Sequence, residues 1–324
     1  MSPADSSTLS SSRIGLKRAM RALTPPVLLN LSIKLLRRVG LLEPPPARKR
    51  LSERKLPKSQ PPAVPEPPMF EFVPEGWARE VPGWDSGAVA QSYLKKWPEW
   101  VAALDGPGPL GIYHEVPDGV PLPRDNMDAH GTLMAFAYVL ARAANGRGKM
   151  SVLDWGGGLA HYSVLARAVL PEVELEWHCR EVPTVAAAGE TVNPEVTFHS
   201  DDDCLTRTYD LVFASGSFQF AIQWQDLLRR FAEATRGFLY ITRLPIASGP
   251  SFVVVQHAGP VGYATDYLGW VICRDELLAE AAAAGLILDR EALLHASFAA
   301  DGAPEQPTPH RGYLFQPNRA QMHG

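Results

Sequence analysis

The segment Ser151–Tyr162 constrains the fold more than any other part of this 324-residue chain. An apolar run leads to Asp154, three glycines follow at positions 156–158, and a helical pattern begins at His161. Glycines suit such a turn because they adopt backbone dihedral angles that other residues resist, and because a ligand can approach the bare backbone closely. The segment therefore predicts a buried strand, a tight ligand-binding turn and a helix.

The chain after Gly148 alternates apolar runs with helical segments, which is typical of βαβ units and a largely parallel sheet. An Ala-rich helix is expected over residues 275–284, and the strands that follow it are close enough to pair as an antiparallel edge. The pattern predicts an α/β, Rossmann-like fold with helices on both faces of a mostly parallel sheet. Strands are expected at Met150–Asp154, Val173–Cys179, Val196–His199, Tyr209–Ala214, Phe238–Thr242, Phe252–Gln256, Leu286–Leu288 and Tyr313–Gln316.

A carboxylate stands at the end of the next apolar run, because Glu181 follows Gly156 by 25 residues. In doubly wound folds an acid about 20 residues after the glycines binds ribose hydroxyls. A dinucleotide fingerprint, G-x-G-x-x-G/A, would place His161 in its last glycine position, so that pattern is incomplete here. The ribose-binding geometry is therefore present without the full dinucleotide motif.

The pattern for S-adenosylmethionine is an acid two residues before G-x-G-x-G/A, and Asp154, Gly156, Gly158 and Ala160 fill it. An acid beside the turn suits the ammonium and sulfonium charges of this cofactor, whereas it would repel a pyrophosphate. S-adenosylmethionine is thus the expected cofactor, held by Asp154, the glycines including Gly157, and Glu181.

Several blocks carry a resemblance to a known family: 153–158 with His161-Tyr162, 177–183, 213–220, 242–245 and Val255-Gln256. From about Gly76 to Gln316 the chain resembles a family of class I methyltransferases that is associated with bacterial surface-polysaccharide gene clusters. The resemblance implies a seven-stranded methyltransferase sheet and S-adenosylmethionine as the cofactor. Ala160 stands where the family more often has a glycine.

Methyl transfer from a sulfonium is an in-line displacement with a neutral leaving group, so positioning matters most and a general base helps when the acceptor is a hydroxyl. His161 is a candidate base and Tyr162 a hydrogen-bonding wall of the site, although both also suit helix-start packing. His130 lies at the start of the helix before the first strand of the sheet, a segment that covers the cofactor in similar methyltransferases. Arg243 follows a buried strand, where it could bind an anionic group or pair with an acid.

Two further cofactor contacts are expected after the third and fourth strands of the sheet. Ser215 follows the fourth strand at the crevice where ligands of such folds bind. Asp201 opens a run of three acids after the third strand, where one carboxylate could contact the adenine amino group. No metal site is expected, because His178 and Cys179 lie where strand packing accounts for them.

Charge is unevenly distributed along the chain. Residues 1–68 hold 13 Lys and Arg against 4 Asp and Glu, a net charge of +9, whereas the remainder holds 18 against 31 and carries −13. A nucleic-acid-binding body is therefore not expected. Three scattered cysteines without a CxxC indicate a reducing, cytoplasmic compartment.

Three regions are predicted. Residues 1–68 form a basic, Pro-rich, disordered tail with an amphipathic helix at about 27–42, which would pack on its own protein or contact a partner protein or the inner face of a membrane. Residues 69–147 form a helical cap or lid region, with helices near 86–104 and 125–145. Residues 148–324 form the methyltransferase domain.

Three functions are compatible with these observations. The first is S-adenosylmethionine-dependent O-methylation of a sugar or polysaccharide precursor, in which the sugar rests only on the resemblance. The second is a non-catalytic, cofactor-binding scaffold in polysaccharide assembly. The third is an NAD-dependent sugar-modifying enzyme.

Overall fold

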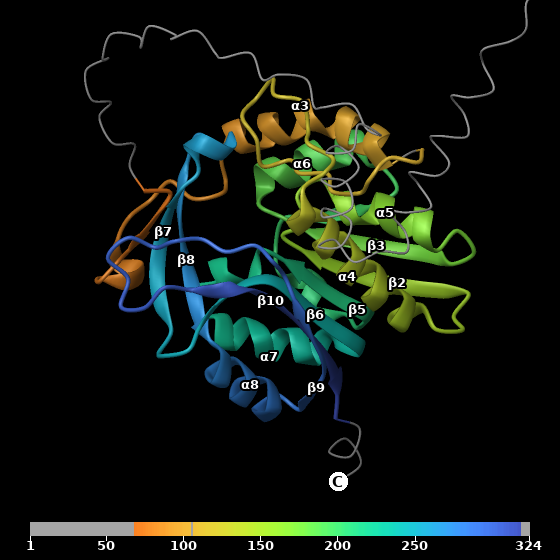
Figure 1. Cartoon of the computed structure of the whole chain (residues 1–324). Coiled ribbons are helices and arrows are strands. Elements are labelled where there is room, and N and C mark those ends of the chain that lie inside the picture. Colours follow the sequence, from red (N-terminus) through yellow and green to blue (C-terminus); the bar gives the residue numbers. More distant parts are fainter. Residues whose placement is uncertain (1–67, 105, 319–324) are drawn as a thin grey trace, which may run out of the picture. The chain divides into compact units, whose positions relative to one another are not determined.

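The computed structural model describes residues 68–104 and 106–318 (Figure 1). Two compact units are distinguished, residues 1–64 and 65–324, and the described residues all belong to the second. The tail predicted for residues 1–68 lies outside the described residues up to position 67, and so does its predicted helix at 27–42.

Strands and helices alternate through most of the described chain, as the apolar pattern predicts. The strands are β1 (Phe70–Phe72), β2 (Lys149–Trp155), β3 (Glu174–Arg180), β4 (Thr197–His199), β5 (Tyr209–Ser215), β6 (Thr235–Ala247), β7 (Phe252–His257), β8 (Asp266–Cys273), β9 (Leu286–Leu293) and β10 (Thr308–Pro317). The α-helices are α3 (Gly87–Leu104), α4 (Met127–Ala144), α5 (His161–Val169), α6 (Pro183–Val192), α7 (Trp224–Ala234) and α8 (Arg274–Ala283). Short 3₁₀ turns are η1 (Gly76–Ala78), η2 (Asp203–Thr206), η3 (Phe218–Phe220) and η4 (Gly259–Val261).

The sheet is mixed and has a doubly wound core. Strands β4, β3, β2, β5 and β6 lie side by side in that order and are all parallel. Strand β10 pairs antiparallel with both β6 and β9, which confirms the expected antiparallel edge. The predicted Rossmann-like α/β architecture is therefore confirmed.

The sheet differs from the prediction in its size, since it has ten strands where the resemblance implies seven. Strand β6 extends beyond its pairing with β5, and its end at Ile246 and Ala247 pairs with β8. Strand β7 pairs antiparallel with β8, and β1 pairs antiparallel with β7. The apolar runs did not predict β1 or β8. In β8 the pattern is interrupted by Gly269, where an added Cβ would come within 3.2 Å of the Phe220 ring.

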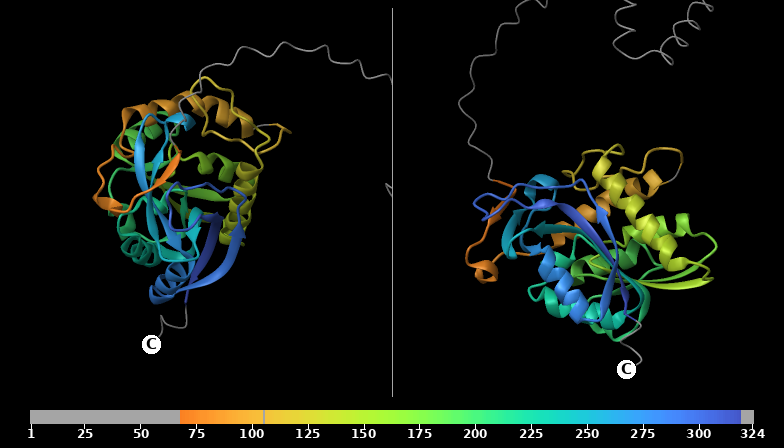
Figure 2. Two further views of the ribbon diagram at one scale, coloured as in Figure 1. Left: turned by 60° about the vertical axis from the view of Figure 1, so that its left-hand side comes forward. Right: turned by 60° about the horizontal axis from the view of Figure 1, so that its bottom comes forward.

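Two layers of helices cover the two faces of the sheet (Figures 1 and 2). Alternation along the strands explains this: Met150 and Val152 of β2 pack in the core beneath α4 and α5, whereas Leu153 and Trp155 pack in the core beneath α7 and α8. Strand β2 thus contributes side chains to both cores.

The segment before β2 builds one side of the cavity described below. Helix α3 packs on α5 and α6, and α4 packs on α5 and the sheet. The side chain of Asn126 caps α4 by accepting a hydrogen bond from the Ala129 amide at 2.8 Å. Within the described residues, no helix is both long and apolar enough to cross a bilayer.

Candidate functional site

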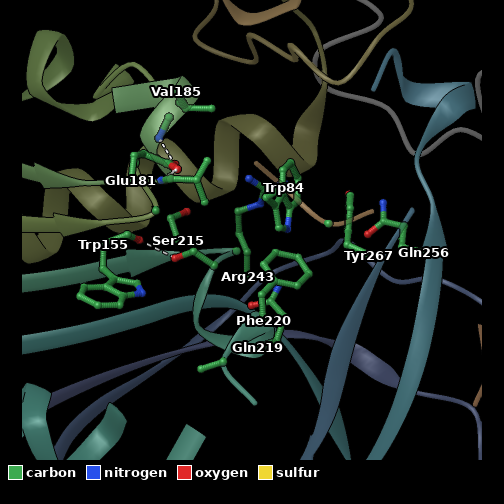
Figure 3. Close-up of a pocket in the computed structure, with 18 of the residues that line it drawn as sticks. Trp84, Trp155, Glu181, Val185, Ser215, Gln219, Phe220, Arg243, Gln256 and Tyr267 are labelled. Carbon is green, nitrogen blue, oxygen red and sulfur yellow. Dashed lines mark hydrogen bonds between the residues drawn. The ribbon is translucent and has the colours of Figure 1, made fainter. Parts of the chain in front are cut away.

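A cavity of about 740 Å³ lies over the carboxyl ends of β2, β3, β5 and β6 (Figure 3). Ligands of open α/β sheets bind at this edge. Its lining includes Trp155, Arg180, Ser215 and Arg243, which stand at or near the ends of these four strands. The volume is in the range of small-molecule and cofactor sites.

The glycine turn after β2 forms one wall of the cavity. Gly156 and Gly158 have positive φ angles of 68° and 62°. A Cβ on Gly156 would come within 2.4 Å of the Ser217 Cβ, and one on Gly157 within 2.4 Å of the Asp154 Cγ. Gly156 and Gly157 are thus required for packing, because the space that a side chain would need at these positions is filled by Ser217 and Asp154. We had expected a ligand in this space.

Ala160, in the position where the resembling family more often has glycine, is also left-handed, with φ 59° and ψ 48°. An L-residue pays a steric cost in this region. Its side chain is fully buried at the start of α5. The backbone of the turn is therefore strained at this one non-glycine position.

Asp154 lies beneath the turn with its carboxyl group against Gly157. The side chain is fully buried and does not line the cavity, and neither carboxylate oxygen forms a hydrogen bond of ordinary geometry, although the Trp177 indole N–H is close enough to lower its pKa somewhat. Burial, reinforced by the charge of Glu181, raises the pKa of Asp154 to about 8. A buried acid without a partner favours a cation nearby.

Glu181 follows β3 and connects the glycine turn to the start of α6. Its Oε1 accepts a hydrogen bond from the Gly158 amide at 2.8 Å, and its Oε2 accepts one from the Val182 amide at 2.9 Å. Burial raises the pKa of this carboxyl group. Each carboxylate oxygen has a second acceptor position, so Glu181 retains the capacity to accept two hydroxyl groups.

Ser215 and Tyr162 are brought together on the cavity wall. The Tyr162 hydroxyl and the Ser215 Oγ are 2.9 Å apart, and the Tyr162 ring packs against Phe136 and Phe213. Both residues line the cavity beside the glycine turn. Their predicted proximity to the cofactor site agrees with this placement.

The predicted adenine contact, Asp201, does not line the cavity. Its carboxylate is exposed and accepts a hydrogen bond from the Asp203 amide. The neighbouring Asp202 lines the cavity instead and pairs with Arg180 at 2.9 Å and Arg230 at 2.8 Å. A run of three acids could not show which carboxylate turns inward.

Arg243 stands near the middle of the cavity in a left-handed conformation, with φ 55°. Here β6 bulges against β10, because Ile241 faces Tyr313 and Leu244 faces Arg311. The bulge gives the guanidinium a partner on the loop between α3 and α4, since Arg243 forms an ion pair with Glu115. Pairing with an acid is one of the two roles that the sequence analysis left open.

This ion pair determines the charge of Glu115. Burial would raise the pKa of its carboxyl group, but the charges of Arg243 and His114 lower it to about 2, aided by a hydrogen bond from the Tyr113 hydroxyl at 3.1 Å. The pKa of Arg243 is raised further by the same pairing. Both groups are therefore charged and mutually compensated.

The two predicted catalytic histidines lie in different environments. His161 lines the cavity but is stacked on His114, with ring centroids 5.2 Å apart, and is enclosed by Trp97 and Trp100. Burial and His114 lower its pKa to about 3, so the structure favours a packing role over the predicted role as base. His130, on the first turn of α4, is not among the lining residues.

Several lining residues were not predicted as part of a site. They come from α3 and the segment before it, the loop before α4, β7, β8 and the loop before it, and β10: Trp84, Tyr93, His114, Glu115, Gln256, Tyr263, Tyr267 and His310. Gln256 belongs to a block quoted for the family resemblance, and Trp84 to a cluster of tryptophans. No sequence motif near the other residues predicts a site, because only the tertiary fold brings them to the cavity.

No family model matches the chain, and no curated protein matches it in sequence. Solved structures do match it. A sugar N-methyltransferase of Streptoalloteichus, KedS8, is 16% identical, covers 58% of this chain and 87% of its own, and has a TM-score of 0.38. The CcbJ methyltransferase of Streptomyces caelestis is 17% identical over 58% of this chain and 89% of its own, with a TM-score of 0.39.

The 1,6-didemethyltoxoflavin-N1-methyltransferase of Burkholderia thailandensis, with bound S-adenosylhomocysteine, is 16% identical over 58% of this chain and 79% of its own, with a TM-score of 0.39. These identities and TM-scores are low, and nothing about the ligand of this chain follows from them. The ligand must be inferred from the cavity.

Proposed function

We propose that this chain is an S-adenosylmethionine-dependent methyltransferase that methylates a hydroxyl group of a sugar or polysaccharide precursor. The observation that carries the cofactor assignment is Asp154, an acid that is fully buried beside the glycine turn without a hydrogen-bond partner. A ligand that brings an ammonium and a sulfonium charge to this turn would compensate it. The sugar acceptor is supported by the sequence resemblance alone.

The residues around the turn fit this cofactor. Glu181 would accept the ribose hydroxyls while its two backbone hydrogen bonds hold the carboxylate against the turn. Ser215 at the end of β5 and Tyr162 on α5 would hold the amino acid end. A pyrophosphate would instead meet the charges of Asp154 and Glu181, which weighs against the NAD-dependent alternative.

When bound, the cofactor supplies a methyl group on a positively charged sulfur, a neutral leaving group once the methyl has moved. The protein then has to position the acceptor and exclude water. Positioning the two reactants can lower the barrier by about 7–11 kcal/mol. The walls of the cavity are suited to this, because α3 and the loop carrying Glu115 lie on one side and β7 and β8 on the other.

A calorimetric titration with S-adenosylhomocysteine tests the cofactor assignment. We expect the wild-type protein to bind it and Glu181→Ala to bind it more weakly by about 1–3 kcal/mol, because hydroxyl partners would be lost. Glu190→Ala, an exposed position on α6, is the matched control and should bind as the wild type does. A folded wild-type protein that does not bind the ligand would refute the proposal.

A further inference from the structure

The cavity extends beyond the space around the glycine turn. In the view of Figure 3, Arg243 lies between Ser215 on one side and Tyr267 and Gln256 on the other. We use the name distal half for the lining residues Trp84, Gln219, Phe220, Gln256, Tyr267 and His310. Because the residues fitting the cofactor lie on the other side of Arg243, the distal half is available to the acceptor.

Aromatic rings form one wall of the distal half. Trp84 and Tyr267 stack with ring centroids 4.1 Å apart and planes 24° apart. Phe220 lies 5.2 Å from Trp84 and 5.0 Å from Tyr267, centroid to centroid. Such a wall presents a broad, rigid and largely apolar surface to a ring-shaped ligand.

Neutral polar groups on this wall lack partners. The Trp84 Nε1, the Gln219 Oε1 and both ring nitrogens of His310 are buried without a hydrogen bond. Unpaired buried polar groups are uncommon in proteins and call for a partner. The set contains donors and acceptors, which matches hydroxyl groups because a hydroxyl both donates and accepts.

The positive charges along the described lining of the cavity are compensated. The cationic side chains there are Arg180, Arg230 and Arg243, and each forms an ion pair with Asp202 or Glu115. None of the residues that define the distal half is charged. Phosphate and diphosphate groups are usually bound by free Arg or Lys side chains, so the distal half lacks the groups that a nucleotide diphosphate would need.

We propose that the distal half binds an uncharged glycosyl unit, one that a glycosyl-transfer reaction has already separated from its nucleotide diphosphate. This inference rests on the proposed function and places the methylation after glycosyl transfer. A carbon–oxygen bond forms to the acceptor hydroxyl as the methyl carbon–sulfur bond breaks. The sulfur keeps the electron pair, and the hydroxyl proton passes to water.

Matched pairs of ligands test the inference on protein saturated with S-adenosylhomocysteine. Each pair is one sugar as its methyl glycoside and as its uridine or deoxythymidine diphosphate derivative, taken from hexoses, 6-deoxyhexoses and N-acetylhexosamines. We expect at least one methyl glycoside to show saturation transfer by NMR, and its nucleotide derivative to bind no more tightly. A nucleotide sugar that binds tenfold more tightly than its methyl glycoside, or a panel with no bound glycoside, would overturn the inference.

Variants locate the binding. His310→Asn should reduce saturation transfer to the glycoside several-fold, whereas His295→Asn, at an exposed histidine outside the cavity, should leave it unchanged. Glu115→Gln frees Arg243 and should raise the affinity for the nucleotide sugar at least fivefold. If S-adenosylhomocysteine itself does not bind, the proposed function fails; if it binds and the glycoside does not, only this inference fails.

Discussion

Two acids have opposite environments: Asp154 is fully buried behind the glycine turn, and Glu115 is partly exposed on the lining of the cavity. Burial and the charge of Glu181 raise the pKa of Asp154 to about 8. The charges of Arg243 and His114 outweigh the burial of Glu115 and lower its pKa to about 2. Groups whose environments separate their pKa values in this way have different roles.

The difference indicates which end of the cavity favours a charged ligand. Near Asp154 an uncompensated acid favours a positively charged ligand, in line with the proposed cofactor. Near Glu115 the charge is already compensated by Arg243, so a neutral ligand fits without breaking an ion pair. The same cavity would therefore accept a cation at one end and an uncharged group at the other.

The largest expected effect comes from breaking the compensated pair. Glu115→Ala leaves Arg243 partly buried without its partner, and the free energy of unfolding should fall by about 3 kcal/mol, measured by urea denaturation. The matched control is Glu174→Ala, which removes an exposed ion pair with Lys149 and should change the free energy of unfolding far less. Equal losses in both variants would show that the Glu115 pair contributes no more than a surface pair.

The uncompensated acid should respond in the opposite way. Asp154→Asn should lower the affinity for S-adenosylmethionine about tenfold, or about 1.4 kcal/mol, because an asparagine cannot ionise in response to the positive charge of the cofactor as the Asp154 carboxyl group can. The stability of the cofactor-free protein should stay the same or rise, since an unpaired buried acid is removed. Isothermal titration and urea denaturation measure the two effects. A loss of stability without a loss of affinity would remove Asp154 from the cofactor site.

The free energy of unfolding should depend on pH in opposite ways through Asp154 and through the histidines of the site. Burial lowers the pKa of His114, His161 and His310 to about 4, 3 and 4, so their stabilising contribution is present above pH 6.5 and is lost as pH falls. Asp154 has the opposite sign, because its contribution is present below 3.8 and is lost as pH rises through about 8.

Between about pH 5 and pH 6.5 the two effects oppose each other. Stability should rise with pH in the wild type, and it should rise more steeply in Asp154→Asn, by up to about 1.4 kcal/mol per pH unit. Urea denaturation at intervals across this range measures the slopes. Parallel slopes for the two proteins would contradict a raised pKa of Asp154.

The cofactor end of the cavity could be predicted from the sequence, and the distal end mostly could not. The glycine turn and Glu181 are encoded by residues near each other in the sequence, with spacing that the fold fixes. Glu115 and Tyr267 reach the cavity only through the loop before α4 and through β8, which no apolar pattern predicted. Asp201 was the predicted adenine contact, but Asp202 is the acid of this run that lines the cavity. The spacing along the sequence does not show in which direction the turn after a strand points each side chain.

Backbone strain occurs at the glycine turn and at the centre of the cavity, and it offers the finest test of the comparison. Ala160 at the cofactor end and Arg243 at the centre are the non-glycine residues with positive φ in the described chain. At Arg243 the side chain forms the pair with Glu115, so glycine would remove a needed group. At Ala160 only a methyl group would be lost. Ala160→Gly should therefore stabilise the protein by about 1 kcal/mol.

A second alanine provides the control for that change. Ala166 lies inside α5 and is also fully buried, but it has an ordinary helical position, so Ala166→Gly should destabilise the protein by about 1 kcal/mol or more. By both thermal and urea unfolding, alanine to glycine should therefore stabilise the protein at Ala160, the N-cap of α5, and destabilise it at Ala166 within α5. If Ala160→Gly also destabilises, the side chain of Ala160 contributes more to packing than its conformation costs, and the strain at this turn does not limit stability.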